Sequence, residues 1–401
     1  MTLLMDGFPP SPEHQVTLAN WRTSPFNRWA FHHVREVVPS ADIPNDPAGV
    51  LPLPSDPLGL KTLAVESGGP DPLSFDEFLD ETSTDGLVIL HRGRVVFEHY
   101  GNGMTPGTPH ILMSVSKSLL GLLAGVLVGR KELDPDRPVT EVIPEVAGTA
   151  YRGATVRHLL DMRARIAFDE DYLATSGPMD AYRKATGWKP AGLGESPLDL
   201  RTFYQTLTAR SGMHGGPVHY VSPNTDLLGW VIERATGRRY ADLMSELIWQ
   251  PLGAERSAYI TVDRLGAPRC AGGFCATARD LARVGQLIVQ GGARGSVQII
   301  PEAWIEDIVR SGDRDAWAAG DLAGYFSGEP IRYRSQWYVY DVKAPVVFAF
   351  GVHGQSLYVS QKHEIVIAKV SSQALPIDAD CGQMTARAVS GIIRFLAASS
   401  R

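Results

Sequence analysis

The pattern of apolar and polar positions divides the chain into two β-rich ends and a helical middle. Two β-branched runs within residues 86–100 flank Arg92-Gly93 and predict a hairpin. Near the other end, strands are expected at residues 345–352, 357–359 and 364–370. Apolar periodicity and capping residues predict helices at residues 74–79, 155–162, 198–207, 224–236, 240–249, 277–290, 301–309 and 384–397, with Pro251 ending the helix at 240–249.

This order of elements predicts an α+β fold, in which an antiparallel sheet built from both ends of the chain is flanked by helices and carries an α-helical insertion. We expect three parts: an irregular N-terminal arm over residues 1–70, an α/β domain formed by residues 71–132 and 253–401, and a helical domain over residues 133–252. The aromatic residues of the arm, Trp21, Phe26, Trp29 and Phe31, predict that it packs on the body. Residues 168–190 form a long loop, which is typical of an active-site lid.

Composition narrows the classes of function. The 401 residues carry a formal net charge of −6 and no cluster of lysine and arginine, so neither nucleic acid nor a membrane surface is an expected partner. The apolar run at residues 119–128 is too short to span a bilayer, and no signal peptide is visible. Three cysteines without metal-ligand spacing suggest free thiols. We expect a cytoplasmic protein that acts on a small molecule and needs no cofactor; a homodimer is left open.

Ser114 and Lys117 are the most informative pair, because they open a long apolar run that ends near Gly129. Residues three apart on a helix are neighbours, so the amine of Lys117 can reach the hydroxyl of Ser114 and help to remove its proton. An apolar helix is expected to be buried, and burial lowers the pKa of a lysine towards that of a usable base. The backbone amides at the helix start could stabilise an oxyanion. The alternative is a lysine that extends from a surface helix into solvent.

Tyr220 is the candidate proton shuttle, because it lies just ahead of a predicted helix. A neighbouring ammonium, such as that of Lys117, is expected to lower the pKa of the phenol. Tyr220 could then take the proton from Ser114 and pass it to the leaving group. The alternative is a tyrosine whose ring only fills the core.

The strand around Val352, His353 and Gly354 is the second candidate part of the site. An edge strand here could present a backbone amide as a second oxyanion donor beside that of Ser114. Gly354 would permit a substrate to approach closely. His353 could be a base, a metal ligand or a hydrogen-bonded structural residue. Because it has no spaced partner, and because His32-His33 are adjacent, no metal site is expected.

Several segments together resemble the serine β-lactamase-like superfamily of penicillin-recognising enzymes and related esterases. The absence of a G-x-S-x-G elbow argues against an α/β-hydrolase. The resemblance covers most of the chain from about residue 85, and it is strongest to the 6-aminohexanoate-dimer (nylon-oligomer) hydrolases. It rests on Asn27-Arg-Trp-Ala-Phe31, Leu112-Met-Ser-Val-Ser-Lys-Ser118, Tyr220-Val-Ser-Pro-Asn-Thr-Asp226, Pro251-Leu-Gly253, Gly272-Gly273, Ala278-Arg-Asp-Leu281 and His353-Gly-Gln355.

The resemblance implies a role for each matching residue. Ser114 would be the nucleophile, Lys117 its activator and Tyr220 the general acid and base. The amides of Ser114 and Val352 would form the oxyanion hole. Tyr172 and Trp188 match aromatic residues that close over the substrate, although they could equally be packed for stability alone.

The sequence also departs from the superfamily. Ser222 stands where β-lactamases and DD-peptidases usually carry asparagine, and the strand at Val352 has no Lys-Thr-Gly, whose lysine binds the carboxylate of a β-lactam. The lid carries Asp180, Arg183 and Lys184, a mixed set of charges. We therefore expect a serine hydrolase that cleaves small linear amides, similar to 6-aminohexanoate oligomers, or carboxylic esters through an acyl-enzyme. The alternatives are a β-lactamase or DD-peptidase, and a non-catalytic binding protein on the same fold.

Overall fold

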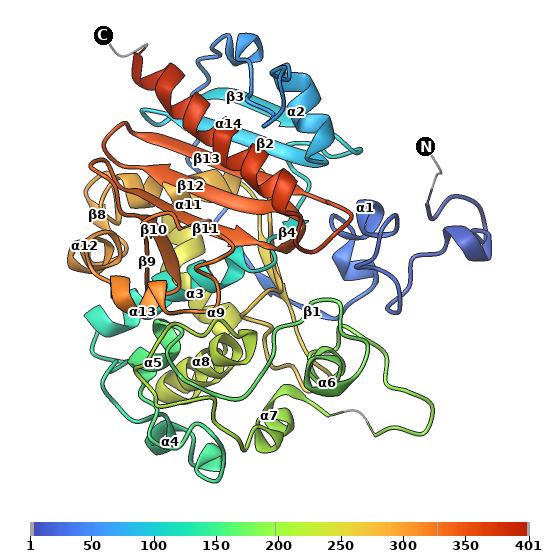
Figure 1. Ribbon diagram of the computed structural model, residues 1–401, viewed down its shortest axis with the longest axis vertical. Coiled ribbons are helices and arrows are strands. Elements are labelled where there is room, and N and C mark those ends of the chain that lie inside the picture. Colours follow the sequence, from blue (N-terminus) through green and yellow to red (C-terminus); the bar gives the residue numbers. More distant parts are fainter. Residues whose placement is uncertain (1–3, 197, 327, 399–401) are drawn as a thin grey trace.

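A seven-stranded antiparallel sheet forms the centre of the molecule. The structure is a computed structural model that describes residues 4–196, 198–326 and 328–398 (Figure 1). In spatial order the strands are β3 (Arg94–Tyr100), β2 (Thr84–His91), β13 (Ile365–Ser371), β12 (Gln355–Ser360), β11 (Val346–Gly351), β10 (Trp337–Tyr340) and β9 (Ile331–Arg334). The expectation of a sheet built from both ends of the chain is confirmed, although β9 and β10 were not foreseen.

Successive side chains along the strands of this sheet point to opposite faces and pack into two separate hydrophobic cores. Val88, Leu90 and Val366 point to one face, where they pack with α3 (Val115–Gly129) and α11 (Ala278–Val289). Ile89 and Ile367 point to the opposite face. That face is covered by α2 (Phe75–Glu81) and by α14 (Ala379–Ala398), which crosses the front of the sheet in Figure 1. The strands therefore lie between two helical layers, and α3 is enclosed between the sheet and the helical region.

The hairpin and several helix ends confirm the expected local signals. Arg92 and Gly93 have φ values of 52° and 72°, as a tight two-residue hairpin turn requires. Ser74 and Thr155 cap α2 and α5, and Thr277 caps α11, each by accepting a backbone hydrogen bond. The last helix, α14, begins at Ala379, five residues before the expected start.

A second, four-stranded sheet was not expected. Its order is β1 (Ser40–Ile43), β5 (Ala258–Thr261), β6 (Phe274–Ala276) and β4 (His110–Ile111). These strands have only two to four residues, which is too short for a recognisable alternation. Since β1 belongs to the N-terminal arm, the prediction of a wholly irregular arm is wrong. This sheet leads directly into the start of α3, so it fixes the position of Ser114.

The middle of the chain is helical, as predicted. Its helices are α4 (Val139–Val142), α5 (Val156–Leu160), α6 (Gly177–Ala185), α7 (Leu200–Phe203), α8 (Ser222–Thr236), α9 (Tyr240–Met244) and α10 (Gln250–Leu252), with a π-helical turn at Ser245–Trp249. The prediction that Pro251 ends a helix at residue 249 is wrong, because proline is tolerated in the first turn of α10. Residues 168–190 are not a pure loop, since they contain α6. The remaining α-helices and strands are α1 (Asn27–Ala30), α12 (Glu302–Arg310), α13 (Arg314–Ala318), β7 (Ala293–Arg294) and β8 (Val297–Gln298).

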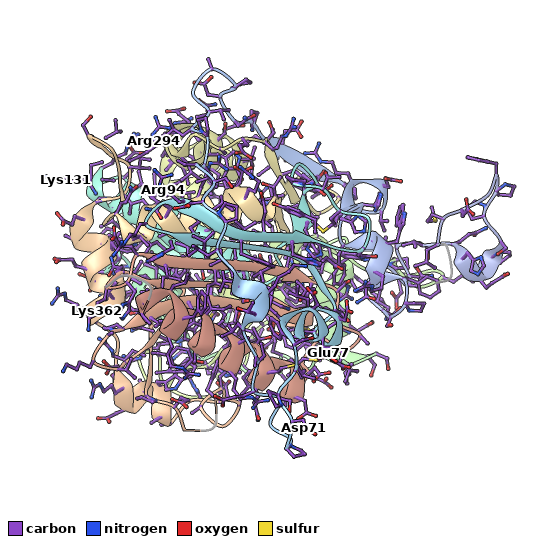
Figure 2. The ribbon with its side chains drawn as sticks, turned by 90° about the horizontal axis from the view of Figure 1, so that it is seen from above. Asp71, Glu77, Arg94, Lys131, Arg294 and Lys362 are labelled. Atoms are coloured by element: carbon purple, nitrogen blue, oxygen red, sulfur yellow. The ribbon has the colours of Figure 1, made fainter. Side chains whose placement is uncertain are left out.

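The arm packs its aromatic side chains against the body, as the sequence suggested. Trp21 and Phe31 are buried and meet edge to face, with ring centres 6.2 Å apart. Seen from above, the first described residues of the arm, from residue 4 on, extend away from the body (Figure 2). In the parts of the chain that the structure describes, no helix combines the length and apolarity needed to cross a membrane. The proposed domain boundaries stay a prediction.

Candidate active site

The start of α3 places Ser114 at the mouth of a cavity. Ser114 is the N-cap residue and follows Met113, whose φ is 45°, so the chain turns sharply just before the helix. Leu112 donates to the carbonyl of Phe274 at 2.8 Å, which anchors this turn to β6. The amide nitrogen of Ser114 has no backbone acceptor among the described residues. It is therefore available as a hydrogen-bond donor.

Lys117 lies one turn along the same helix and is buried, as expected. Its Nζ donates to the Ser114 Oγ at 2.8 Å, to the Ser222 Oγ at 3.1 Å and to the carbonyl of Ala271 at 2.8 Å. Burial lowers the pKa of Lys117 to about 7. A neutral amine keeps two donors and gains a lone pair, so at neutral pH Lys117 can accept the proton of Ser114.

Tyr220 joins this pair from the segment before α8. The Nζ of Lys117 lies 4.9 Å from the centre of the Tyr220 ring, and the phenol is close enough to Ser114 for this side chain to lower its pKa. The expectation that Lys117 lowers the pKa of Tyr220 is wrong. Burial of the phenol raises its pKa, and the interaction with Ser114 offsets this only in part. Tyr220 is consequently protonated at neutral pH and is suited to donate a proton.

Glu170 is a neighbour of the site that sequence reasoning missed. Its carboxylate accepts hydrogen bonds from both the amide and the hydroxyl of Ser222, the former at 2.7 Å. The negative charge of Glu170 raises the pKa of Lys117 and so partly offsets the effect of burial. In the sequence, Glu170 is one of three consecutive acidic residues, so no pattern distinguishes it from its neighbours. Only the folding of the lid against α8 identifies it.

The end of β11 approaches the nucleophile closely. A Cβ atom on Gly351 would lie 2.8 Å from the amide nitrogen of Ser114, so only glycine fits there. The expectation of an edge strand is wrong, since β11 lies between β10 and β12. However, its pairing with β10 ends at Phe348, so the chain from residue 349 to Val352 extends beyond that neighbour. This leaves Val352 in the lining of the cavity beside Ser114.

His353 is held as a structural residue. Its Nδ1 is hydrogen-bonded to the carbonyl of Gln373 at 2.8 Å, and burial lowers its pKa to about 4. It has a φ of 61° and packs edge to face on Phe31. The expected role of Gly354 is wrong: a Cβ there would meet the side chain of Gln373 at 2.7 Å, so this glycine serves internal packing rather than substrate approach. No group of residues suited to a metal ion occurs within the described ranges.

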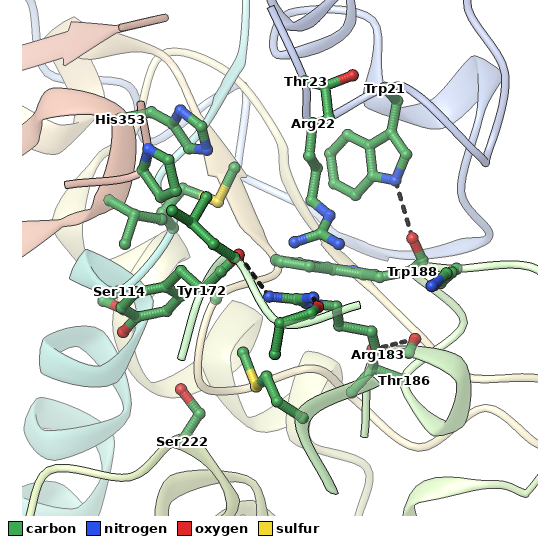
Figure 3. Close-up of a pocket in the computed structure, with 18 of the residues that line it drawn as sticks. Trp21, Arg22, Thr23, Ser114, Tyr172, Arg183, Thr186, Trp188, Ser222 and His353 are labelled. Atoms are coloured by element: carbon green, nitrogen blue, oxygen red, sulfur yellow. Dashed lines mark hydrogen bonds between the residues drawn. The ribbon is translucent and has the colours of Figure 1, made fainter. Parts of the chain in front are cut away.

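Tyr172, Trp188 and His353 line the cavity (Figure 3). Val352 belongs to the same lining. The cavity has a volume of about 320 Å³, in the range of small-molecule sites. Trp188 is buried, its Nε1 donating to the Thr261 Oγ1 at 3.0 Å, while its carbonyl accepts from the Trp21 Nε1 at 3.1 Å. The arm and the lid are thus joined over the cavity.

Cationic side chains are concentrated in the same cavity. Its lining contains Arg22, Arg183, Lys189 and Arg269, and no aspartate or glutamate among the described residues. Arg22 comes from the arm and was not foreseen. Asp180 and Lys184, named from the sequence, pair with each other at 3.1 Å outside this lining.

Comparison with known proteins gives the same fold and the family of the chain. The profile of the family described as Beta-lactamase matches residues 74–390. The chain belongs to this family. It is 36% identical, over 91% of its own length and 90% of the relative's, to the 6-aminohexanoate-dimer hydrolase of Paenarthrobacter ureafaciens. It is also 27% identical to Esterase EstB of Burkholderia gladioli, over 47% of this chain and 50% of that protein.

A solved structure from Bacillus anthracis, named "Putative 6-aminohexanoate-dimer hydrolase", superposes with a TM-score of 0.87 and 27% sequence identity. The superposition covers 97% of this chain and 99% of that one. The expected resemblance and the α+β fold are therefore confirmed. The chain is an enzyme, a serine hydrolase with the β-lactamase-like fold.

Proposed function

We propose that the protein hydrolyses small linear amides or carboxylic esters through an acyl-enzyme formed on Ser114. The observation that carries this proposal is the placement of Ser114, Lys117 and Tyr220 around one hydroxyl group at the mouth of the cavity. The family relatives that are named hydrolases of an amide and of esters support the same class of substrate.

The protonation states of Lys117 and Tyr220 at neutral pH indicate which group acts in each step of the reaction. Lys117, with a pKa of about 7, removes the proton of Ser114 as its oxygen attacks the carbonyl carbon. The amides of Ser114 and Val352 stabilise the oxyanion. Tyr220, which keeps its proton, donates it to the departing nitrogen or oxygen. The ammonium of Lys117 then returns its proton to the phenolate of Tyr220, which resets both groups. Water attacks the acyl-enzyme with Lys117 again as the base, and Tyr220 gives its proton to the departing oxygen of Ser114.

The proposal is tested with p-nitrophenyl butyrate. Ser114→Ala is expected to abolish turnover, because the other hydroxyl that meets the buried amine, that of Ser222, donates its proton to Glu170. Ser118→Ala is the matched control: this serine lies on the same helix and donates to the carbonyl of Gln336 at 2.7 Å, away from the cavity. Substantial activity of Ser114→Ala would refute the proposed nucleophile.

A further inference from the structure

Arg22 points into the cavity without any acceptor of its own. Its guanidinium carbon lies 5.6 Å from the centre of the Trp188 ring and 5.8 Å from that of Trp21 (Figure 3). Within the described residues it forms no ion pair and no hydrogen bond, and its Nε is buried without a partner. Arg22 is half-buried, so its charge has lost part of its hydration and has no anion to compensate for that loss.

The other cations of the lining are already engaged. Arg269 forms a buried ion pair with Asp226, and Lys189 pairs with Asp180. The guanidinium of Arg183 donates to the backbone carbonyls of Ala174, Asp171 (3.2 Å) and Tyr172 (2.6 Å). Among the described residues, Arg22 is thus the cation of this lining whose side chain has no acceptor at all, whereas Arg183 and Arg269 lack a partner at Nε but hold acceptors elsewhere.

The surroundings of Arg22 favour an anion. Burial, and then the charges of Arg183 and Arg269, lower the pKa of Arg22 to about 9, so at pH 7 it is still charged and stands among other positive charges. A ligand that brings a negative charge would relieve both the missing hydrogen bonds and this repulsion. An ammonium group at the same place would be repelled.

We propose that Arg22 binds a carboxylate of the substrate, so that the enzyme's substrates are amides or esters that carry a free carboxylate. The inference rests on the proposed function for the hydrolytic step. The two terminal nitrogens of a guanidinium match the two oxygens of a carboxylate, which makes arginine well suited to this ligand. Trp21 and Trp188 flank the guanidinium and restrict water, which strengthens the pairing.

The N-terminal arm would then take part in binding the substrate. Residues 18, 19 and 21–24 supply part of the cavity wall, although the nucleophile and the lid come from segments far away in the sequence. The hydrogen bond from Trp21 to the carbonyl of Trp188 fixes Arg22 relative to the lid. Specificity for the anion would therefore depend on the arm, and hydrolysis on α3 and α8.

Two matched substrate pairs test the carboxylate on either side of the scissile bond. On the acyl side, mono-p-nitrophenyl adipate is compared with p-nitrophenyl hexanoate. On the leaving side, N-butyryl-6-aminohexanoate is compared with N-hexylbutyramide. Each pair differs only by a carboxylate in place of a methyl group. Because hydrogen bonds to charged groups are worth about 1.5–3 kcal/mol, the wild type is expected to favour the acid of at least one pair by about 10–100-fold in kcat/KM.

Arg22→Gln is expected to reduce this acid-to-neutral ratio at least about tenfold, and Arg22→Lys to retain part of it. Arg35→Gln is the matched control, because Arg35 also belongs to the arm but pairs with Asp42 outside the cavity. A wild type that favours neither acid would overturn the inference, as would a ratio that survives Arg22→Gln.

Two further measurements separate failure of the inference from failure of the proposed function. Adipate binding to Ser114→Ala, measured by calorimetry, reports the anion site without turnover, and it should weaken when Arg22→Gln is added. If Arg22→Gln does not fold, the wild type still gives a result: the KM of the preferred acid should rise with salt while that of its neutral partner does not. A KM of the acid that does not change with salt would contradict the inference even if Ser114 proves to be the nucleophile. Adipate affinity that is the same with and without Arg22→Gln would contradict it as well.

Discussion

Replacing Lys117 with methionine should change how the stability of the protein depends on pH. The amine is 1% exposed, and its pKa falls from 10.5 in the unfolded chain to about 7 in the folded protein. Below pH 7 it is protonated in both states, so folding carries the full cost of burying the charge. Above pH 10.5 it is neutral in both states, and that cost is absent.

The two pKa values set the size of the effect. Linkage gives a cost of about 4 kcal/mol at pH 7 and about 2 kcal/mol at pH 9, since each tenfold change in proton affinity corresponds to about 1.4 kcal/mol. The Lys117→Met variant does not carry this cost at any pH. The stability of the wild type relative to the variant should therefore rise by about 2 kcal/mol between pH 7 and pH 9.

Urea unfolding of both proteins at pH 7, 8 and 9 measures this difference. Taking the difference cancels the other titrating groups, including the second buried lysine, Lys369. Lys362→Met is the matched control, because Lys362 is an exposed residue in the turn between β12 and β13 (Figure 2). A difference between wild type and Lys117→Met that stays constant from pH 7 to pH 9 would refute the assignment of Lys117 as a neutral base.

Three further predictions concern turnover. In the wild type, kcat/KM should rise with pH through about 7 as Lys117 loses its proton. Glu170→Gln should move this rise to lower pH, because the carboxylate of Glu170 raises the pKa of Lys117. A rise that moves to higher pH in the variant would contradict the role of Lys117 as the base. Tyr220→Phe should slow amide hydrolysis by about 10²–10⁴-fold and p-nitrophenyl ester hydrolysis much less, since a good leaving group needs no proton. Equal losses of activity on the amide and the ester would argue against proton donation by Tyr220. Gly351→Ala should lower kcat by at least about tenfold, because its Cβ would lie 2.8 Å from the amide nitrogen of Ser114; an unchanged kcat would show that the close approach is dispensable.

The sequence predicted those features of the fold that depend on local pattern. The hairpin at Arg92-Gly93, the caps at Ser74 and Thr155, and the buried helix after Ser114 each follow from residue types at short spacing. The four-stranded sheet does not, since its strands are short and pair across long distances in the chain. Their pairing is decided by packing rather than by their own sequence.

The same distinction applies to the site. The contact between Ser114 and Lys117 could be predicted from their spacing, because one helix carries both residues. The pKa of Tyr220 could not be anticipated, since it depends on how deeply the ring is buried. Glu170 and Arg22 were missed because they reach the site from the lid and the arm, and no local motif marks either of them.

The central claim is that Ser114 becomes acylated during turnover, and a fluorophosphonate probe tests it most directly. Peptide mapping by mass spectrometry should find the probe on Ser114 of the active enzyme, with loss of activity in proportion to labelling. Labelling should slow below pH 7, where Lys117 is protonated, and should be absent from Ser114→Ala. Complete inactivation with the probe on another residue, or full activity after Ser114 is labelled, would contradict the account.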